Sequence, residues 1–192
     1  LATTILDDGS YMEGSQNYNL LSANVVTSTA QAAEPWGLGL KEWTISPRYS
    51  KNIFLAPWTE SERAFLGMSF DRYGPSQRNV RRLSDLWDSI VPLADYRGIA
   101  FATNDSNEKN LAAVNHEGGG GLDLAYRLWR NPAYVDILKQ HEPRSLIYGT
   151  TELPDTDVHL YEQSLCQDSG GLAVLRSQAE QHPPREQIQA VL

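Results

Sequence analysis

The residue types that could support metal chemistry stand in two short segments of the chain. His116 and Glu117 directly precede four glycines, and this pair could act as a general base with an orienting carboxylate or contribute to a zinc site. Asp155, Asp157 and His159 alternate along the sequence, and their side chains would converge if the segment were extended. A metal-dependent hydrolase that uses these residues is therefore one alternative for the function.

The spacing in both segments favours a structural role instead. A helical zinc motif places two histidines four residues apart around the glutamate, and Gly120 stands where the second histidine would be. Residues 154–157 are typical of an acidic helix N-terminus, where the helix dipole stabilises carboxylates and where the possible ligands would be scattered. We therefore expect no metal, no cofactor and no catalytic residue, with His116 in a loop and His159 on the surface of a helix.

The four glycines, residues 118–121, could let backbone amides approach a phosphate at the start of a helix. A Walker-type phosphate loop requires Lys and then Ser or Thr after its last glycine, whereas this chain has Leu122 and Asp123, whose carboxylate would repel the anion. A hinge or a tight backbone crossing is the favoured interpretation. Cys166, the only cysteine, is expected to be a buried structural residue on the apolar side of a helix.

The composition argues against several classes of protein. The 24 acidic and 16 basic residues give a net charge of −8, and this field repels phosphate backbones, so direct nucleic-acid binding is not expected. No apolar run reaches the roughly 18 residues that a membrane span requires, and no secretory leader is visible. We therefore expect no membrane association, and a virion or the cytoplasm is the favoured location.

The N-terminal part of the chain, residues 1–57, is rich in Ser, Thr, Asn and Gly. Glycines and prolines interrupt its short runs of β-type residues at 24–29, 42–45 and 52–55. We expect an irregular, extended or β-type arm. Three tryptophans in or next to this arm could anchor an interface or pin the arm to its own core. They are Trp36, Trp43 and Trp58.

The remainder, residues 58–192, is predicted to be helix-rich with a few short strands. The clearest helix is predicted over residues 79–91, and it should end there because Pro92 disfavours helical geometry in the residue before it. Its buried face is predicted to hold Leu83, Trp87 and Ile90, and its solvated face Arg81, Arg82 and Asp88.

Capping residues and helix-breaking residues predict where the other helices and strands begin. Asn131 can cap a helix over residues 131–141, and Pro132 occupies its first position, where the missing N–H costs nothing. Further helices are predicted to begin at a capping box over residues 59–62, after Asn104, and near residues 122, 155, 172 and 184. Short strands are predicted at residues 97–103 and 146–148.

The chain is therefore expected to form an α+β fold, either as one domain or as a segment of a larger polypeptide. It starts at Leu1 and ends on the apolar residues 190–192 within a helical pattern, which favours a segment. This C-terminal helix is then expected to pack Ile188, with Val191 or Leu192, against something outside the monomer, since so short a helix is marginal in water.

The expected function is structural self-assembly, most concretely as a fragment of a viral capsid (shell) protein without catalytic activity. Its partners would be other protein subunits or the remaining segments of the same polypeptide. The candidate interface residues are Trp36, Trp43, Trp58, Ile188 and Val191. The alternatives are the metal-dependent hydrolase and an acidic inhibitor or immunity-type module, whose negative field would cover a basic partner.

Overall fold

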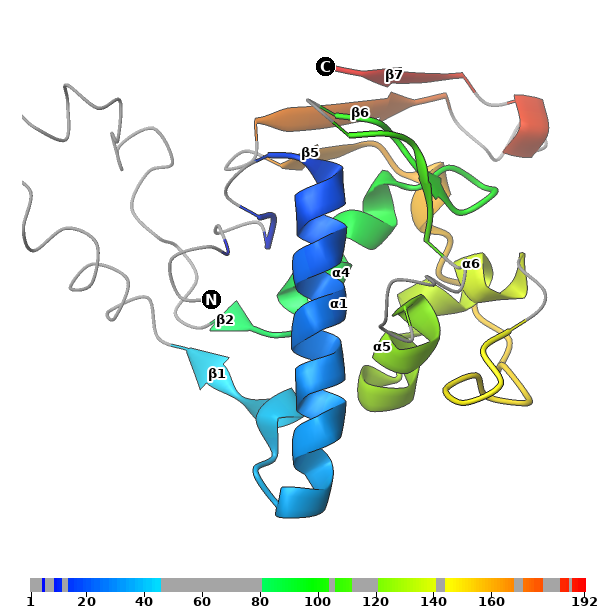
Figure 1. The fold of residues 1–192 in the computed structure, drawn as a ribbon. Helices are drawn as coiled ribbons and strands as arrows, with labels where there is room; N and C mark the ends of the chain where they lie inside the picture. The colour runs from blue at the N-terminus through cyan, green and yellow to red at the C-terminus, as the bar shows by residue number, and fades with distance from the viewer. Residues whose placement is uncertain are drawn as a thin grey trace, which may run out of the picture.

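The α+β class is confirmed by a computed structural model, which describes residues 5, 9–11, 14–45, 81–103, 106–111, 121–140, 144–167, 171–177, 184–186 and 188–192. A long helix, α1 (Gln16–Ala33), dominates the described part, and α4 (Asp85–Ile90) and α5 (Gly121–Trp129) pack against it (Figure 1). A further short helix, α6 (Val135–Lys139), packs on α5. Short 3₁₀ helices lie between these elements and the strands: η1 (Glu34–Trp36), η2 (Leu40–Glu42), η4 (Val91–Leu93), η5 (Pro132–Tyr134), η6 (Leu160–Glu162) and η8 (Pro184–Glu186).

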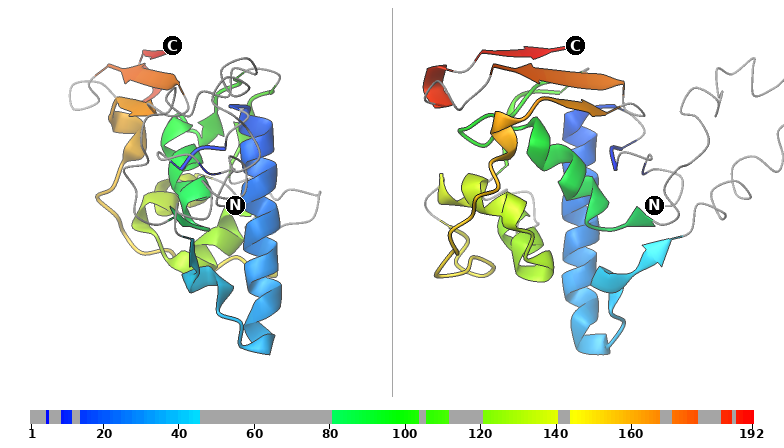
Figure 2. Two further views of the ribbon diagram at one scale, coloured as in Figure 1. Left: turned by 90° about the vertical axis from the view of Figure 1, so that its left-hand side faces the viewer. Right: turned by 180° about the vertical axis from the view of Figure 1, so that it is seen from behind.

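The described strands are short and antiparallel, and they form three separate sheets. The two-stranded sheets pair β1 (Thr44–Ile45) with β2 (Arg81–Arg82), and β3 (Ile99–Ala100) with β4 (Lys109–Asn110). The largest sheet has the order β5 (Leu165–Gln167), β6 (Leu172–Arg176), β7 (Gln189–Val191). It lies at the N-terminal end of α1 in every view (Figures 1 and 2).

Helix α1 overturns the expectation of an extended arm, because residues 24–29 lie inside it. Its larger apolar side chains Leu21 and Val25 face solvent. An apolar periodicity therefore gives no helix signal here, and packing against α4 and α5 rather than local propensity stabilises the helix. The buried stripe does repeat at helical spacing, but it consists mainly of polar or small residues: Gln16, Asn19, Leu20, Ala23, Asn24, Thr27, Ala30 and Ala33.

The core lies between α1, α4, α5 and α6. Trp87 of α4 is fully buried in it, and its indole Nε1 donates a 2.8 Å hydrogen bond to the Thr27 hydroxyl of α1. This bond satisfies the indole N–H inside the core and sets the register between the two helices. The surrounding core side chains include Leu20, Ala23, Leu86, Ile90, Leu122, Ala125, Tyr126, Tyr134, Val135 and Leu138.

The helix predicted over residues 79–91 is shorter than expected at its N-terminal side. Arg81 and Arg82 form strand β2 instead, and the Asp85 carboxylate accepts a 2.8 Å hydrogen bond from the Arg82 amide where α4 begins. The α-helix ends at Ile90, one residue before the predicted end, and the chain continues through Pro92 as η4. The predicted buried face is also confirmed, since Leu83, Trp87 and Ile90 are all buried.

Two of the predicted helices are confirmed. Helix α5 covers the predicted residues, and Asn131 Oδ1 accepts a 3.0 Å hydrogen bond from the Ala133 amide at the start of η5, which leads into α6. Strand β3 lies within the predicted segment 97–103. The capping box at residues 59–62 and the run at 52–55 lie outside the described residues.

Several weaker predictions are wrong. Residues 146–148 form a turn rather than a strand, and the segment from residue 155 to 159 is not helical. Strands β4, β6 and β7 stand where helices were expected. The three strands share a cause, because each is paired antiparallel with another segment: β4 with β3, and β6 with β5 and β7. A short segment suits a helix or a strand almost equally, and such a partner decides between them.

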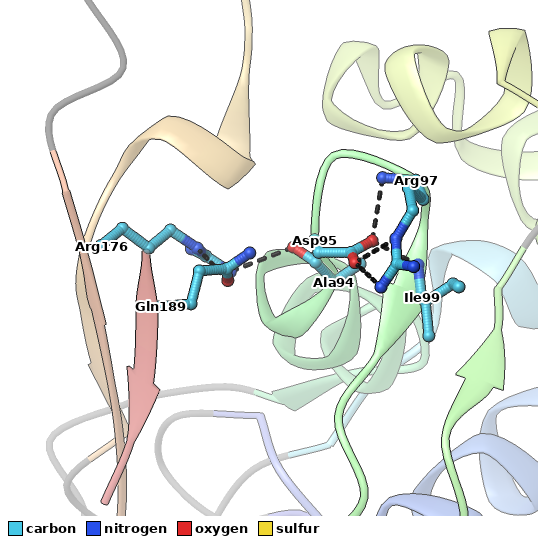
Figure 3. A network of polar contacts seen from close by, with 6 residues as sticks. All are labelled: Ala94, Asp95, Arg97, Ile99, Arg176 and Gln189. Atoms are coloured by element: carbon cyan, nitrogen blue, oxygen red, sulfur yellow. Dashed lines mark hydrogen bonds and ion pairs between the residues drawn. The ribbon is translucent and has the colours of Figure 1, made fainter. Parts of the chain in front are cut away.

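The buried side chain of Arg176 holds the largest sheet against the rest of the molecule (Figure 3). Burial lowers the pKa of this guanidinium to about 10, so the group is still charged at neutral pH. Its five hydrogen bonds run to the carbonyl oxygens of Pro92 (2.7 Å), Ala94 (3.0 Å), Gln163 (2.6 Å) and Leu160 (3.2 Å), and to Gln189 Oε1 (3.1 Å).

Asp95 fixes the turn that follows this contact. Its Oδ1 accepts hydrogen bonds from the amides of Arg97 (2.8 Å) and Ile99 (3.1 Å), and its Oδ2 accepts one from Arg97 Nε (2.7 Å) (Figure 3). The chain therefore enters strand β3 in a defined geometry directly beside the carbonyls that Arg176 binds.

Replacing Trp87 with Ala should lower the free energy of unfolding by about 3 to 5 kcal/mol, because it empties a large core site. The same substitution at Trp36, which is 81% exposed, should change it by less than about 0.5 kcal/mol. Equilibrium unfolding in urea measures both values. A loss below about 1 kcal/mol for Trp87→Ala would show that the buried face of α4 is assigned wrongly.

Replacing Arg176 with Met keeps much of the apolar stem but removes every guanidinium hydrogen bond. Because the buried carbonyls of Pro92 and Ala94 then lose a donor, the free energy of unfolding should fall by about 3 kcal/mol. Arg185→Met on the exposed η8 is the matched control and should change it by less than about 0.5 kcal/mol. Equal urea midpoints for the two variants would contradict the anchoring role of Arg176.

Candidate functional site

Two of the described tryptophans are strongly exposed, and both lie in one loop after α1. We call residues 34–43 the tryptophan loop. It carries Trp36 and Trp43, which are 81% and 56% exposed, and the exposed Leu38 between them. The loop lies at the C-terminal end of α1, at the opposite end of this helix from the largest sheet (Figure 1). Exposed aromatic side chains on one loop are typical of protein-binding surfaces.

A proline and two glycines determine the local shape of the loop. Pro35 lies in the first turn of η1, where its missing N–H costs nothing. Gly37 and Gly39 then adopt left-handed backbone conformations with φ of 69° and 54°, which glycine takes without steric cost. These turns reverse the chain after α1 and leave the apolar side chains on either side in solvent.

Two contacts hold the loop in place. Lys41 Nζ lies 2.8 Å from Glu34 Oε1, and this hydrogen-bonded ion pair across the loop raises the pKa of Lys41. Trp129 Nε1 of α5 donates a 3.1 Å hydrogen bond to the Lys41 carbonyl oxygen. The exposed tryptophans are thus presented by a loop that is tied to the helices, which reduces the conformational entropy lost when a partner binds.

A polar cleft of about 530 Å³ adjoins the loop. Lys41, Arg82 and Arg130 bring positive charge to its lining, and Glu42 and Asp88 bring negative charge. Arg130 has a left-handed backbone with φ of 52°, a conformation common where a helix such as α5 ends. The described lining thus carries a small excess of positive charge on a chain whose net charge is −8.

Asp88, which the sequence places on a solvated face, is instead half-buried in this lining and hydrogen-bonded within it. The Tyr134 hydroxyl donates a 2.6 Å hydrogen bond to Asp88 Oδ1, and Asn131 Nδ2 donates a 2.8 Å hydrogen bond to the same oxygen. Burial raises the pKa of Asp88, and burial beside this carboxylate also raises the pKa of Tyr134. The expectation was wrong because η5 packs on α4 here, and the group joins these two elements.

The candidate metal ligands Asp155, Asp157 and His159 are not brought together. Their segment is not helical, yet the side chains still diverge because two of them pair with different residues of α6. Asp155 Oδ1 lies 2.9 Å from Lys139 Nζ, and His159 Nδ1 lies 2.5 Å from Asp136 Oδ2. Among the residues that the structure describes, no three His, Cys, Asp or Glu side chains are grouped to hold a metal ion.

The other candidate residues lie on the largest sheet or outside the described part of the chain. Cys166 is exposed on β5 rather than buried in a helix, because strand alternation turns it away from the core. The predicted C-terminal helix is wrong, since residues 189–191 form β7, but Ile188 and Val191 are exposed there. Trp58, His116 and Glu117 lie outside the described residues.

Two features of this site were not predicted from the sequence, namely the contact of Trp129 with the loop and the exposure of Leu38. The contact of Trp129 with Lys41 joins residues far apart in the chain, so no local pattern predicts it. Leu38 carries a signal, because it stands between Gly37 and Gly39, and an apolar residue between two glycines often lies in an exposed turn.

No family model, curated protein or solved structure matches this chain. Within the part of the chain described, no helix is long and apolar enough to cross a membrane. The functional inference therefore rests on the geometry of the tryptophan loop and the cleft beside it.

His159 should titrate above the usual histidine value of about 6.5, because its hydrogen bond to Asp136 favours the charged ring. Asp136→Asn should lower this pKa. The contribution of this pair to stability is fully present below about pH 6.5, the pKa of the histidine in the unfolded chain. It is lost as the pH rises through the higher pKa of His159 in the folded state. NMR titration of the assigned ring measures the shift, and equal pKa values in the two proteins would contradict the pairing.

Proposed function

We propose that this chain is a structural component that acts by binding other protein subunits, and that the tryptophan loop is one of its contact surfaces. The observation that carries the proposal is the exposure of Trp36 and Trp43 on a loop that Trp129 holds in place. Covering apolar surface contributes about 25 cal/mol per Å², so these side chains stabilise a complex once a partner excludes water from them.

The surroundings of the loop suit an interface. Aromatic anchors at the centre of an interface are commonly bordered by polar groups at its rim. Here Lys41, Arg82 and Arg130 line the cleft beside the loop. Because each copy of the chain has a net charge of −8, these cations offer a place where carboxylates of another subunit meet positive charge.

The most concrete form of the proposal is a segment of a viral shell protein. A shell subunit contacts several neighbours at once, and it does so through surfaces rather than through a catalytic group. The aromatic anchors support this form. The separate pairing of Asp155 with Lys139 and of His159 with Asp136 counts against the metal-dependent hydrolase.

Sedimentation velocity over a wide range of protein concentrations tests the proposal. The wild-type chain should form concentration-dependent oligomers. The double variant Trp36→Ser, Trp43→Ser should raise the dissociation constant at least about tenfold, because it removes the aromatic anchors of the contact.

Leu146→Ser is the matched control, since it removes a fully exposed leucine outside the tryptophan loop, and it should associate as the wild type does. Far-UV circular dichroism and urea unfolding check that each variant keeps its fold. A wild-type chain that stays monomeric throughout the range, or a double variant that associates equally well, would overturn the proposal.

A further inference from the structure

We propose that the outer face of the sheet β5–β6–β7 is a second contact surface, over which two copies of this chain stack face to face. The inference rests on the proposed function, since it identifies a partner and a surface for subunit assembly. The sheet and the tryptophan loop lie at opposite ends of α1 (Figures 1 and 2), so one contact does not block the other. The 18 residues of α1 alone separate the two ends by about 27 Å.

Strand alternation defines the two faces of this sheet. In β6, Val174 and Arg176 are buried and face the core, whereas Leu175 between them is 51% exposed. Residues that are directly paired share a face, so Ala190, which pairs with Leu175, and Ala173, which pairs with Cys166, belong to the outer face.

The outer face extends beyond the bounds of β7. Ala173 and Leu192 exchange hydrogen bonds of 3.1 and 3.0 Å, and the Ser177 amide donates a 3.0 Å hydrogen bond to the Ile188 carbonyl oxygen. Ile188 and Leu192 are 76% and 74% exposed. We call the resulting set the outer sheet face: Cys166, Ala173, Leu175, Ile188, Ala190 and Leu192.

The outer side of the sheet is more apolar than that of an ordinary surface sheet. An antiparallel sheet with one face in water normally places polar residues on that face and apolar ones inside. Here the inner face is mixed, because it carries both polar and apolar side chains: Gln167, Arg176, Gln189, Leu165, Leu172, Val174 and Val191. The outer sheet face exposes the aliphatic side chains of Leu175, Ile188 and Leu192, with the polar Ser177 beside Ile188 at its margin. An exposed aliphatic cluster is the pattern of a face that another protein layer covers.

Symmetry and the absence of charged side chains favour a second copy of the chain as the partner. Each copy has a net charge of −8, but no side chain of the outer sheet face is charged, so two copies can approach there without bringing like-charged side chains together. An uncharged apolar face is also complementary to itself, as the symmetric contact of a dimer requires. The two sheets would stack about 10 Å apart with their side chains interdigitated.

The alternative geometry for two copies is edge pairing through β7. Its described residues, Gln189–Val191, include no Lys and no Pro, which are common guards of an exposed edge. Edge pairing would form one six-stranded sheet, in which the two Cys166 residues lie five strand spacings, or about 24 Å, apart. Face-to-face stacking instead places both thiols in or beside the same interface.

Crosslinking through Cys166 distinguishes these geometries, because it is the only cysteine of the chain and lies on the outer sheet face. The full chain is treated with a short bismaleimide and analysed by denaturing electrophoresis, while sedimentation velocity measures association. Face-to-face stacking predicts a covalent dimer. A sedimenting dimer without the crosslink would indicate edge pairing or association through the tryptophan loop alone, and either result would overturn the proposal.

Substitution of Leu175 tests the contact itself. Leu175→Lys places a charge at the centre of the outer sheet face and should weaken dimerisation at least about tenfold and abolish the crosslink. Leu146→Lys, at a fully exposed position outside the sheet, should change neither. Leu175→Glu should behave as Leu175→Lys does, but an equal mixture of the two should regain the crosslinked dimer, because opposite charges then meet. This rescue requires both variants to be folded.

The outcomes separate this inference from the proposed function. If Leu175→Lys leaves association unchanged while the tryptophan-loop double variant loses it, the proposed function stands and the sheet contact is wrong. If the wild type is monomeric and forms no crosslink, both are wrong. A mixture of the Lys and Glu variants that stays monomeric would also overturn the stacking of this face on itself.

Discussion

The guanidinium group of Arg176 is the contact on which the arrangement of the largest sheet depends. It binds backbone carbonyls at the end of η4 and around η6, and it binds Gln189 on the neighbouring strand. These bonds set which face of β6 and of β7 turns inward. Because side chains alternate along a strand, Leu175 and Ala190 must then face outward. A buried polar anchor thus produces an apolar outer surface.

Helix α1 likewise buries polar side chains and exposes apolar ones. Its buried stripe includes Asn19 and Thr27, and the Thr27 hydroxyl accepts the indole hydrogen bond of Trp87, while Leu21 and Val25 face water. A buried polar group that finds a partner, as the Thr27 hydroxyl does, specifies one arrangement of the helices. The consequence is again that apolar side chains are left on the surface.

The tryptophan loop and the outer sheet face lie at the two ends of α1, and a subunit with two separate contact surfaces can join more than one neighbour. The loop, with its exposed tryptophans beside a polar cleft, suits the directional contact that we propose, whereas the sheet face suits a symmetric one. Because the two surfaces differ in chemistry, the two proposed contacts would form independently, as an extended assembly of identical chains requires.

The sequence alone determined the elements whose signals are local, namely the α+β class, helix α5, the Asn131 cap and the burial of Trp87. It also marked Trp36 as a candidate for an interface or for the core by residue type, but only the tertiary structure decided that this side chain lies on the surface. The same holds for α1 and for strands β4, β6 and β7. In each case the deciding contact lies outside the element itself, as with the hydrogen bond between Thr27 and Trp87, and the local pattern of an element carries no information about such a partner.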